Sequence, residues 1–308
     1  MSHQAPLTQP EAAVAPAPPL GRLQDVGGRK LMVHRSGTGG PAVVFLPGAG
    51  LVGLHYLNVH DRIAEVTTSV LYDRAGTGWS EPVALPRTAA AVTDELRDLL
   101  RAAGVPAPYV LVGHSLGGAY ARHYAQRFPD EVAGLLLLDP FHEDLLDHVP
   151  QQLQERQEQL NSQDLPDLTA DQLQQFRAAL TQLLAKWPDP VRRPLLEHQL
   201  AAWRTGWYEG RNLHGEVADE IRRGPALPDV PMIVLTALGY DVTQAHLCSE
   251  EEIRAINAAK HDLHAQLAAS AGRGEHRVLN DAGHGFLHED RPDAVLQAIS
   301  ELLGEAGS

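Results

Sequence analysis

The sequence predicts an α/β fold in which a mostly parallel central sheet is flanked by helices. Short apolar runs without an alternating pattern recur along the chain, as in parallel strands that are buried on both faces. Stretches with helical periodicity separate these runs, and one long segment, residues 142–225, interrupts the rhythm. Buried strands, alternating helices and a single insertion therefore define the expected architecture.

The composition is that of an ordinary globular protein. Of the 308 residues, 44% are hydrophobic and 21% are charged, so the chain can fill a large core. The formal net charge of -14 repels phosphate backbones and anionic membranes, which argues against a nucleic-acid or membrane partner. Cys248 is the single cysteine, so no intramolecular disulfide can form.

The N-terminal segment, residues 1–20, is expected to be a disordered tail. It is rich in alanine and proline, and it lacks the basic and apolar regions of a signal peptide. The longest apolar runs, such as Gly134 to Leu138, are far shorter than the ~20 residues that cross a bilayer. The sequence therefore predicts a cytoplasmic protein without a membrane span.

Strand and helix signals alternate in the first half of the chain. Residues 31–35 and 42–46 are short β-rich runs, and the Gly-rich segment 37–41 between them is typical of a hairpin-type turn. The elements expected next are a strand over 69–72, a helix over 88–103, a strand over 109–112, a helix over 116–127 and a strand over 132–138.

The second half begins with the insertion and then returns to the βα rhythm. Residues 142–225 are rich in Gln, Glu, Leu and Trp, and they include an amphipathic stretch near 172–184, so we expect a helical cap or lid. The following elements are a strand over 232–237, a helix over 249–269, a strand over 276–279 and a helix over 292–303. The core is thus expected to comprise residues 21–141 and 226–308.

Ser115 is the candidate nucleophile. It is the centre of Gly113-His114-Ser115-Leu116-Gly117, which lies between an expected strand and an expected helix and matches the nucleophile-elbow pattern G-x-S-x-G. Glycine suits positions 113 and 117 because a sharp strand-to-helix turn leaves no room for side chains. The alternative is a tight turn in which Ser115 only caps the helix.

His284 is the candidate general base. A serine hydroxyl is a weak nucleophile until a positioned base takes its proton, so a histidine must come from elsewhere in the chain. Among the 16 histidines, His284 lies in a Gly-flanked loop directly after the strand expected over 276–279. The order of serine first and histidine last is the one described for strand-helix hydrolases with this elbow.

Four segments together resemble the successive signatures of the α/β-hydrolase superfamily. They are Leu46-Pro-Gly-Ala-Gly50, Asp73-Arg-Ala-Gly-Thr-Gly-Trp-Ser80, Gly113 to Gly117 and Ala282-Gly-His284. The resemblance runs from about residue 30 to the C-terminus, apart from the insertion. It implies an α/β-hydrolase fold with the helical cap between the sixth and seventh strands, and a mainly structural role for residues 73–80.

The resemblance also implies an oxyanion hole made by the backbone N–H groups of Ala49 and Leu116. Such donors stabilise the negative charge that develops on the carbonyl oxygen when the tetrahedral intermediate forms. The family commonly has His-Gly at the first loop, whereas this chain has Pro47-Gly48.

Two aspartates are candidates for the acid that orients His284. Asp241 follows the strand over 232–237 at the usual family position, but a whole extra helix then separates it from His284. Asp139 ends the strand over 132–138, which resembles family members that carry the acid on the strand after the elbow. The sequence leaves both open and slightly favours Asp139.

The expected activity is hydrolysis of a carboxylic ester, thioester or lactone through an acyl-enzyme. Carbon–carbon or amide hydrolysis on the same triad, and a non-catalytic small-molecule receptor of the same fold, are the alternatives. The substrate is expected to be a small molecule with an apolar acyl or alcohol group. Four aromatic residues of the insertion either line its pocket or simply pack the cap on the core: Trp187, Trp203, Trp207 and Tyr208.

No cofactor or metal is expected. The glycine-rich segments lack the Gly-Lys-Ser or Gly-Lys-Thr ending of a phosphate-binding loop. His142, Glu143, Asp144 and His148 carry metal-ligating groups, but their spacing fits no zinc motif, and a solvated polar turn explains them. The sequence does not indicate the oligomeric state.

Overall fold

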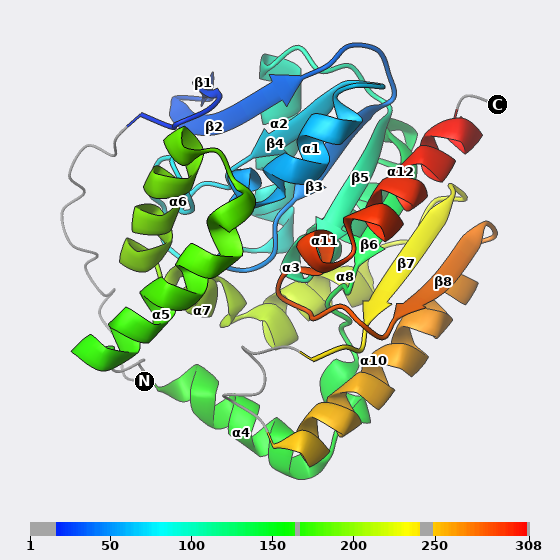
Figure 1. The fold of residues 1–308 in the computed structure, drawn as a ribbon. Helices are drawn as coiled ribbons and strands as arrows, with labels where there is room; N and C mark the ends of the chain where they lie inside the picture. The colour runs from blue at the N-terminus through cyan, green and yellow to red at the C-terminus, as the bar shows by residue number, and fades with distance from the viewer. Residues whose placement is uncertain (1–16, 164–166, 241–248, 307–308) are drawn as a thin grey trace.

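A computed structural model describes residues 17–163, 167–240 and 249–306 of the chain. An eight-stranded sheet forms its centre, with helices on both faces (Figure 1). The strands follow the order β1-β2-β4-β3-β5-β6-β7-β8 across the sheet. Their bounds are β1 Arg22–Val26, β2 Arg29–Ser36, β3 Ala42–Leu46, β4 Ser69–Tyr72, β5 Tyr109–His114, β6 Val132–Leu138, β7 Met232–Ala237 and β8 Gly274–Leu279.

The strands from β4 across to β8 are parallel, and only the β1 and β2 side of the sheet is antiparallel. Neighbouring residues of one strand enter different cores, because side chains alternate between the two faces of a sheet. Leu135 and Leu137 of β6 pack on one face, and Leu136 and Leu138 pack on the other. This two-sided burial explains the continuous apolar runs of the sequence, and the predicted α/β class is confirmed.

Helices cover both faces of the sheet. Residues of α2, α3, α8 and α10 share one core with the sheet, and residues of α1 and α12 share the other. The helix bounds are α1 Leu57–Ile63, α2 Ala89–Ala102, α3 Leu116–Arg127, α4 Gln151–Ser162, α5 Ala170–Leu183, α6 Asp189–Ala201, α7 Thr205–Gly210, α8 Ala218–Arg223, α10 Glu250–Ala269, α11 Leu287–Asp290 and α12 Pro292–Ala306.

The predicted hairpin-type turn at residues 37–41 is wrong. β2 pairs with β1 and β4, whereas β3 pairs with β4 and β5, so β4 separates the two strands that were expected to be neighbours. A Gly-rich segment permits a sharp change of direction, but it does not decide which strand lies alongside. The true hairpin joins β1 to β2 through Gly27 and Gly28, whose φ values of 62° and 88° suit a tight hairpin turn.

Strand β1 was not expected from the sequence. It is an edge strand, and all of its residues are exposed or half-buried. Polar residues dominate its sequence, Arg-Leu-Gln-Asp-Val, so the apolar signal that marks a buried strand is weak here. Backbone pairing with β2 stabilises it instead.

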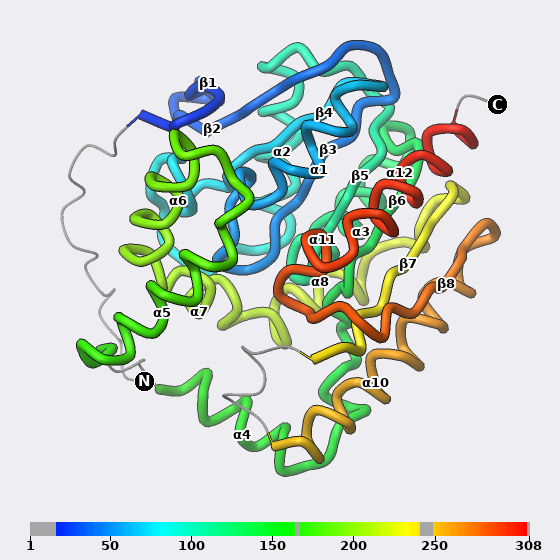
Figure 2. Tube along the Cα trace, viewed as in Figure 1, coloured from blue at the N-terminus to red at the C-terminus, as the bar shows by residue number. Residues whose placement is uncertain are grey.

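Helices α4 to α8 lie between β6 and β7 along the chain. Trp187 and Leu195 from this segment enter the core that α1 and α12 share with the sheet. The Trp187 indole donates to the Leu54 carbonyl at 2.8 Å, so this aromatic residue packs the segment on the core. Helix α4 lies beside α10, which is distant in sequence, and Leu153 and Ala259 belong to one hydrophobic cluster there (Figure 2).

No helix within residues 17–163, 167–240 and 249–306 has the length and apolar character required to span a bilayer.

Several histidines are buried, and burial favours their neutral form. His55 and His60 are fully buried, and His60 Nδ1 lies 2.8 Å from the Ser69 hydroxyl. Burial lowers the pKa of each from the usual 6.5 to about 3. Burial also lowers the pKa of His198 and that of His264 to about 4.

We expect the free energy of unfolding to fall as the pH is lowered from 7 to 5. Between pH 6.5 and the lowered pKa values, the unfolded chain binds more protons than the folded protein, so stability rises with pH over this window. Each histidine that stays neutral accounts for at most about 2 kcal/mol at pH 5. Urea unfolding at both pH values measures how the free energy of unfolding changes with pH, and H60Q should reduce that change. Equal stability at pH 7 and pH 5 would contradict the prediction.

Candidate active site

Ser115 lies at the sharp turn between β5 and α3. The strand ends at His114 and the helix begins at Leu116, so Ser115 is the single connecting residue. Its φ of 51° is unusual for a residue other than glycine. Backbone strain of this kind occurs at functional sites, where the surrounding structure holds a side chain in a particular direction.

The two glycines of the turn are required by close backbone contacts. A Cβ at position 113 would lie 2.6 Å from the Gly117 carbonyl oxygen, and one at position 117 would overlap the Leu46 carbonyl oxygen. Real Cβ atoms do not approach backbone atoms this closely. The steric reason for the G-x-S-x-G pattern is therefore visible in this chain.

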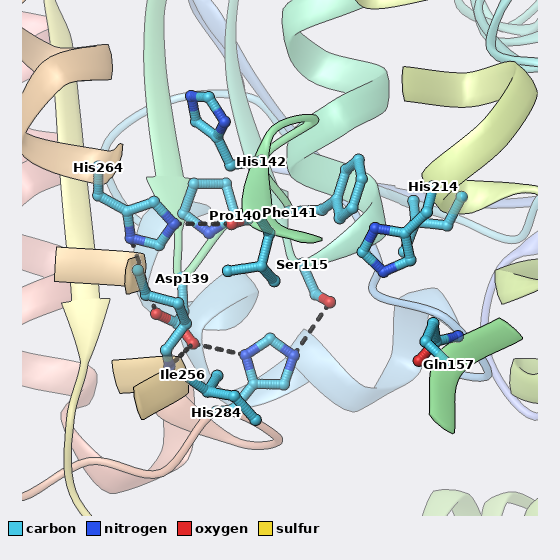
Figure 3. Close-up of a pocket in the computed structure, with 13 residues that line it drawn as sticks. Ser115, Asp139, Pro140, Phe141, His142, Gln157, His214, Ile256, His264 and His284 are labelled. Atoms are coloured by element: carbon cyan, nitrogen blue, oxygen red, sulfur yellow. Dashed lines mark hydrogen bonds and ion pairs between the residues drawn. The ribbon is translucent and has the colours of Figure 1, made fainter. Parts of the chain in front are cut away.

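Ser115, His284 and Asp139 form a continuous chain of hydrogen bonds (Figure 3). His284 Nε2 lies 3.0 Å from the Ser115 hydroxyl, and His284 Nδ1 lies 2.6 Å from Asp139 Oδ2. The three side chains come from the turn after β5, the loop after β8 and the end of β6. In a parallel sheet these carboxyl ends share one edge, which brings distant residues together.

Asp139 is buried at the end of β6 and, like Ser115, has a positive φ, of 40°. Its Oδ1 accepts a hydrogen bond from the Ala237 N–H at 3.1 Å, and its own N–H donates to the Leu235 carbonyl at 2.7 Å. Of the two candidate acids, Asp139 thus contacts His284, while Asp241 lies outside the described residues.

Lys260 of α10 is a second partner of the Asp139 carboxylate. Its ammonium donates to Asp139 Oδ2 at 2.8 Å and to the Ala237 carbonyl at 2.8 Å. Burial alone raises the pKa of Asp139, but Lys260, together with His284, holds that pKa well below its usual range. Asp139 is therefore an anion near neutral pH.

The loop at residues 47–50 lies directly against the turn. A Cβ placed on Gly48 would contact the Ser115 Cβ at 3.4 Å, so the Ala49 amide belongs to a segment beside the hydroxyl. Leu116 is the first residue of α3, and helix geometry leaves the first N–H groups without an intrahelical acceptor. Leu116 thus directly follows Ser115 in the chain, and Ala49 directly follows the glycine that packs against Ser115.

A buried ion pair holds the 47–50 loop. The Arg74 guanidinium donates to the carbonyl oxygens of Pro47 and Gly48, at 2.6 and 3.0 Å. The same side chain pairs with Glu209 of α7, whose carboxylate also accepts the Gly50 N–H at 2.8 Å. The two side chains are only 1% and 4% exposed. We call Arg74 and Glu209 the loop clamp.

A second network joins the loop, the turn and the histidine loop. His114 Nε2 lies 2.7 Å from the His284 carbonyl oxygen, so this nitrogen carries the proton. In the neutral ring, His114 Nδ1 then accepts from the Tyr56 hydroxyl at 2.7 Å, and the Tyr56 oxygen accepts from the Gly48 N–H at 3.3 Å. The His114 side chain thereby links three segments around the site.

A cavity of about 340 Å³ opens at Ser115. Apolar side chains contribute part of its lining: Phe141, Leu145, Leu213 and Ile256. Polar side chains, among them His142, Gln157 and His214, contribute the rest. In Figure 3, His214 and Gln157 lie on the side of the Ser115 hydroxyl, whereas the His142 ring points away from it. The sequence left open whether four aromatic residues line the pocket or pack the cap on the core, and none of them is among the lining residues of the described part of the chain: Trp187, Trp203, Trp207 and Tyr208.

The polar turn that resembled a metal-ligand cluster is used in ion pairs. Glu143 accepts two hydrogen bonds from Arg122, at 2.6 and 2.7 Å, and Asp144 accepts one from Arg222 at 3.0 Å. These ion pairs account for the carboxylates at residues 143 and 144.

Sequence reasoning missed Lys260 and the loop clamp. Lys260 is part of a helical stripe with Ile256, Leu263 and Leu267, and a lysine in an otherwise apolar stripe is a signal of a buried charge. Arg74 lies inside a recognised motif but was assigned only to a structural loop. No local signal marks Glu209, because its partner is 135 residues away in the chain.

The comparisons with known proteins agree on the family. The model of the alpha/beta hydrolase family matches residues 43–298. An esterase from Thermogutta terrifontis superposes with a TM-score of 0.60 and 21% identity, covering 93% of this chain and 97% of that one. At this level of identity the likeness shows the fold alone.

Curated relatives match over shorter regions. The uncharacterised protein YbdG of Bacillus subtilis is 31% identical over 121 residues, which are 39% of this chain and 37% of that protein. The pimeloyl-[acyl-carrier protein] methyl ester esterase of Chromobacterium violaceum is 44% identical over 99 residues, which are 32% of this chain and 37% of the esterase. The matched regions thus span well under half of either relative.

We expect G117A to destabilise the protein by about 2 kcal/mol or more, because the added methyl group must displace the β3 backbone. The matched control is G304A, at a helical position of α12 where a Cβ meets nothing within 4 Å. That change should be neutral or stabilise by up to about 1 kcal/mol. Urea unfolding of both variants tests the steric argument, and equal effects would refute it.

Proposed function

Because the chain belongs to the alpha/beta hydrolase family, we propose that it hydrolyses a carboxylic ester, thioester or lactone through an acyl-enzyme on Ser115. The family match confirms the hydrolase class that the sequence predicted. The observation that carries the proposal is the unbroken series of contacts from the Ser115 hydroxyl through His284 to Asp139.

In the proposed acylation, Ser115 Oγ attacks the carbonyl carbon and its proton passes to His284 Nε2. The protonated imidazole then donates that proton to the leaving alcohol or thiol, and the acyl group stays on Ser115. Asp139 stabilises the imidazolium and holds the ring in the tautomer that presents Nε2 to serine. In the second half, water attacks the acyl carbon and gives a proton to His284. The imidazolium then returns a proton to Ser115 Oγ as its bond to the acyl group breaks, which releases the acid and restores the enzyme.

The Ala49 and Leu116 amides are the proposed oxyanion donors. Charge moves onto the carbonyl oxygen when the tetrahedral intermediate forms, and rigid donors beside Ser115 stabilise that charge without further rearrangement. The loop clamp supports this role for Ala49, because Arg74 and Glu209 hold the residues on both sides of it. We therefore propose Arg74 and Glu209 as positioning residues for the Ala49 amide.

The segment between β6 and β7 is the proposed lid. It supplies Gln157, Leu213 and His214 to the cavity lining, while α10 supplies Ile256 and Lys260. This lining combines apolar and hydrogen-bonding groups, which favours a substrate with an apolar portion and a polar group near the scissile bond. The esterase relative from Chromobacterium violaceum supports an ester as that bond.

We expect a fluorophosphonate probe to label Ser115 and to leave S115A unlabelled, which peptide mass spectrometry measures.

We expect D139N to lower kcat on p-nitrophenyl esters by about 10² to 10⁴, since the orienting carboxylate is lost, whereas D241N should change kcat little. The reverse pattern would assign the acid to Asp241. Folded protein that resists labelling would favour the receptor alternative, and turnover of anilides alone would favour an amidase.

We expect E209Q to lower kcat by about 10-fold or more with little change in KM, because the oxyanion interaction exists mainly in the transition state. Removing one charge of a buried pair also destabilises the fold, by about 3 kcal/mol or more. The matched control is E131Q, which breaks the Arg97–Glu131 ion pair away from the site. An unchanged kcat in folded E209Q would show that the loop clamp does not position Ala49.

A further inference from the structure

One oxygen of the Asp139 carboxylate contacts two partners. Oδ2 receives both His284 Nδ1, at 2.6 Å, and Lys260 Nζ, at 2.8 Å. The proposed reaction needs only the first contact, because one carboxylate suffices to orient and stabilise an imidazolium. Lys260 is thus a charged group at the relay that the mechanism does not use.

The burial of Lys260 costs desolvation free energy, and the fold does not require this lysine to satisfy Asp139. Its side chain is 8% exposed, and the desolvation of a buried lysine commonly cancels the gain from its ion pair. Asp139 already has a hydrogen bond at each oxygen without it, from Ala237 N–H and from His284. This arrangement suggests a role for the charge of Lys260 beyond satisfying the carboxylate.

The other titratable groups around the relay come from several elements. From α10, His264 Nδ1 lies 3.9 Å from Asp139 Oδ1, and burial lowers the pKa of His264 to about 4, so it is neutral near pH 7. After β6, burial also lowers the pKa of His142. From β5, the His114 ring lies 5.3 Å from that of His284. Within the described residues, Lys260 is the cation in direct contact with Asp139.

We propose that Lys260 is a positioning residue. Its charge weakens the electrostatic stabilisation that Asp139 gives to the protonated form of His284. As a result, the hydrolase keeps its activity to a lower pH. The inference rests on the proposed function of Ser115. Lys260 takes no part in the proton transfer, and the transferred proton moves only between Ser115, His284, the leaving group and water. Lys260 acts through its charge on Asp139, without contact with the substrate.

The direction of the effect follows from Coulomb's law. The negative charge of Asp139 favours imidazolium at His284, and a positive charge on the same carboxylate oxygen opposes it. Without the Lys260 charge, Asp139 favours the imidazolium form of His284 more strongly, and an imidazolium cannot act as a base. Charges at such distances shift a neighbouring titration by about one unit or more.

The test is the dependence of kcat/KM on pH for wild-type protein, K260Q and K260R, with p-nitrophenyl butyrate as substrate. K260Q removes the charge and keeps a hydrogen-bond donor, and K260R keeps the charge. The matched control is K30Q, which makes the same substitution at an exposed lysine of β2. We expect the acidic limb of K260Q to move up by about one pH unit, and those of K260R and K30Q to stay at the wild-type position.

Three results would overturn the proposal. If the acidic limb of the kcat/KM profile of K260Q coincides with that of the wild type, Lys260 has a structural role alone. This holds even if the plateau value of kcat/KM is lower in K260Q. A limb that moves equally in K260R would show that the charge is not the cause. If K260Q does not fold, K260M replaces it, and a failure of both neutral variants beside a folded K260R also assigns Lys260 to structure.

The pH dependence of Ser115 labelling by the fluorophosphonate probe separates this proposal from the proposed function. Labelling requires no knowledge of the substrate, and its rate follows the availability of His284 as a base. A wild-type protein that is never labelled contradicts the proposed function. A wild-type protein that is labelled, with the same acidic limb in K260Q, contradicts the role of Lys260 only.

Discussion

The buried carboxylate of Asp139 is the interaction on which the rest of the site depends. A carboxylate removed from water needs hydrogen-bond donors or opposite charges as partners. Here the partners are the β7 backbone, a lysine of α10 and the imidazole of the C-terminal loop. These contacts draw together β6, β7, α10 and the segment after β8. The strained backbone at Asp139 and Ser115 completes the arrangement by directing both side chains to the same imidazole.

The loop clamp follows the same physical logic on the other side of Ser115. Arg74 and Glu209 are buried as a pair, and their remaining hydrogen-bonding groups are satisfied by the backbone of residues 47–50. Such a pair contributes little net stability, because desolvation offsets the attraction between the charges. Its consequence is geometric: it defines the position of a loop that has no secondary structure of its own.

Much of the fold could be predicted because its signals are local. Continuous apolar runs indicated the parallel strands, and crowding at the turn explains why glycines flank Ser115. The error at residues 37–41 has a physical origin, since a turn signal describes the backbone at that point and not the strand that pairs next to it. β1 was missed because an exposed edge strand carries little apolar pattern.

By itself the sequence determined the α/β class and singled out the serine at the elbow and the histidine of the final loop as candidates, because each depends on short segments with their own pattern. Only the tertiary structure decided which groups meet the aspartate and the 47–50 loop. Lys260 is 121 residues from Asp139, and Glu209 is 135 residues from Arg74. Contacts at such separations arise from the packing of whole helices against the sheet, and no local pattern encodes them.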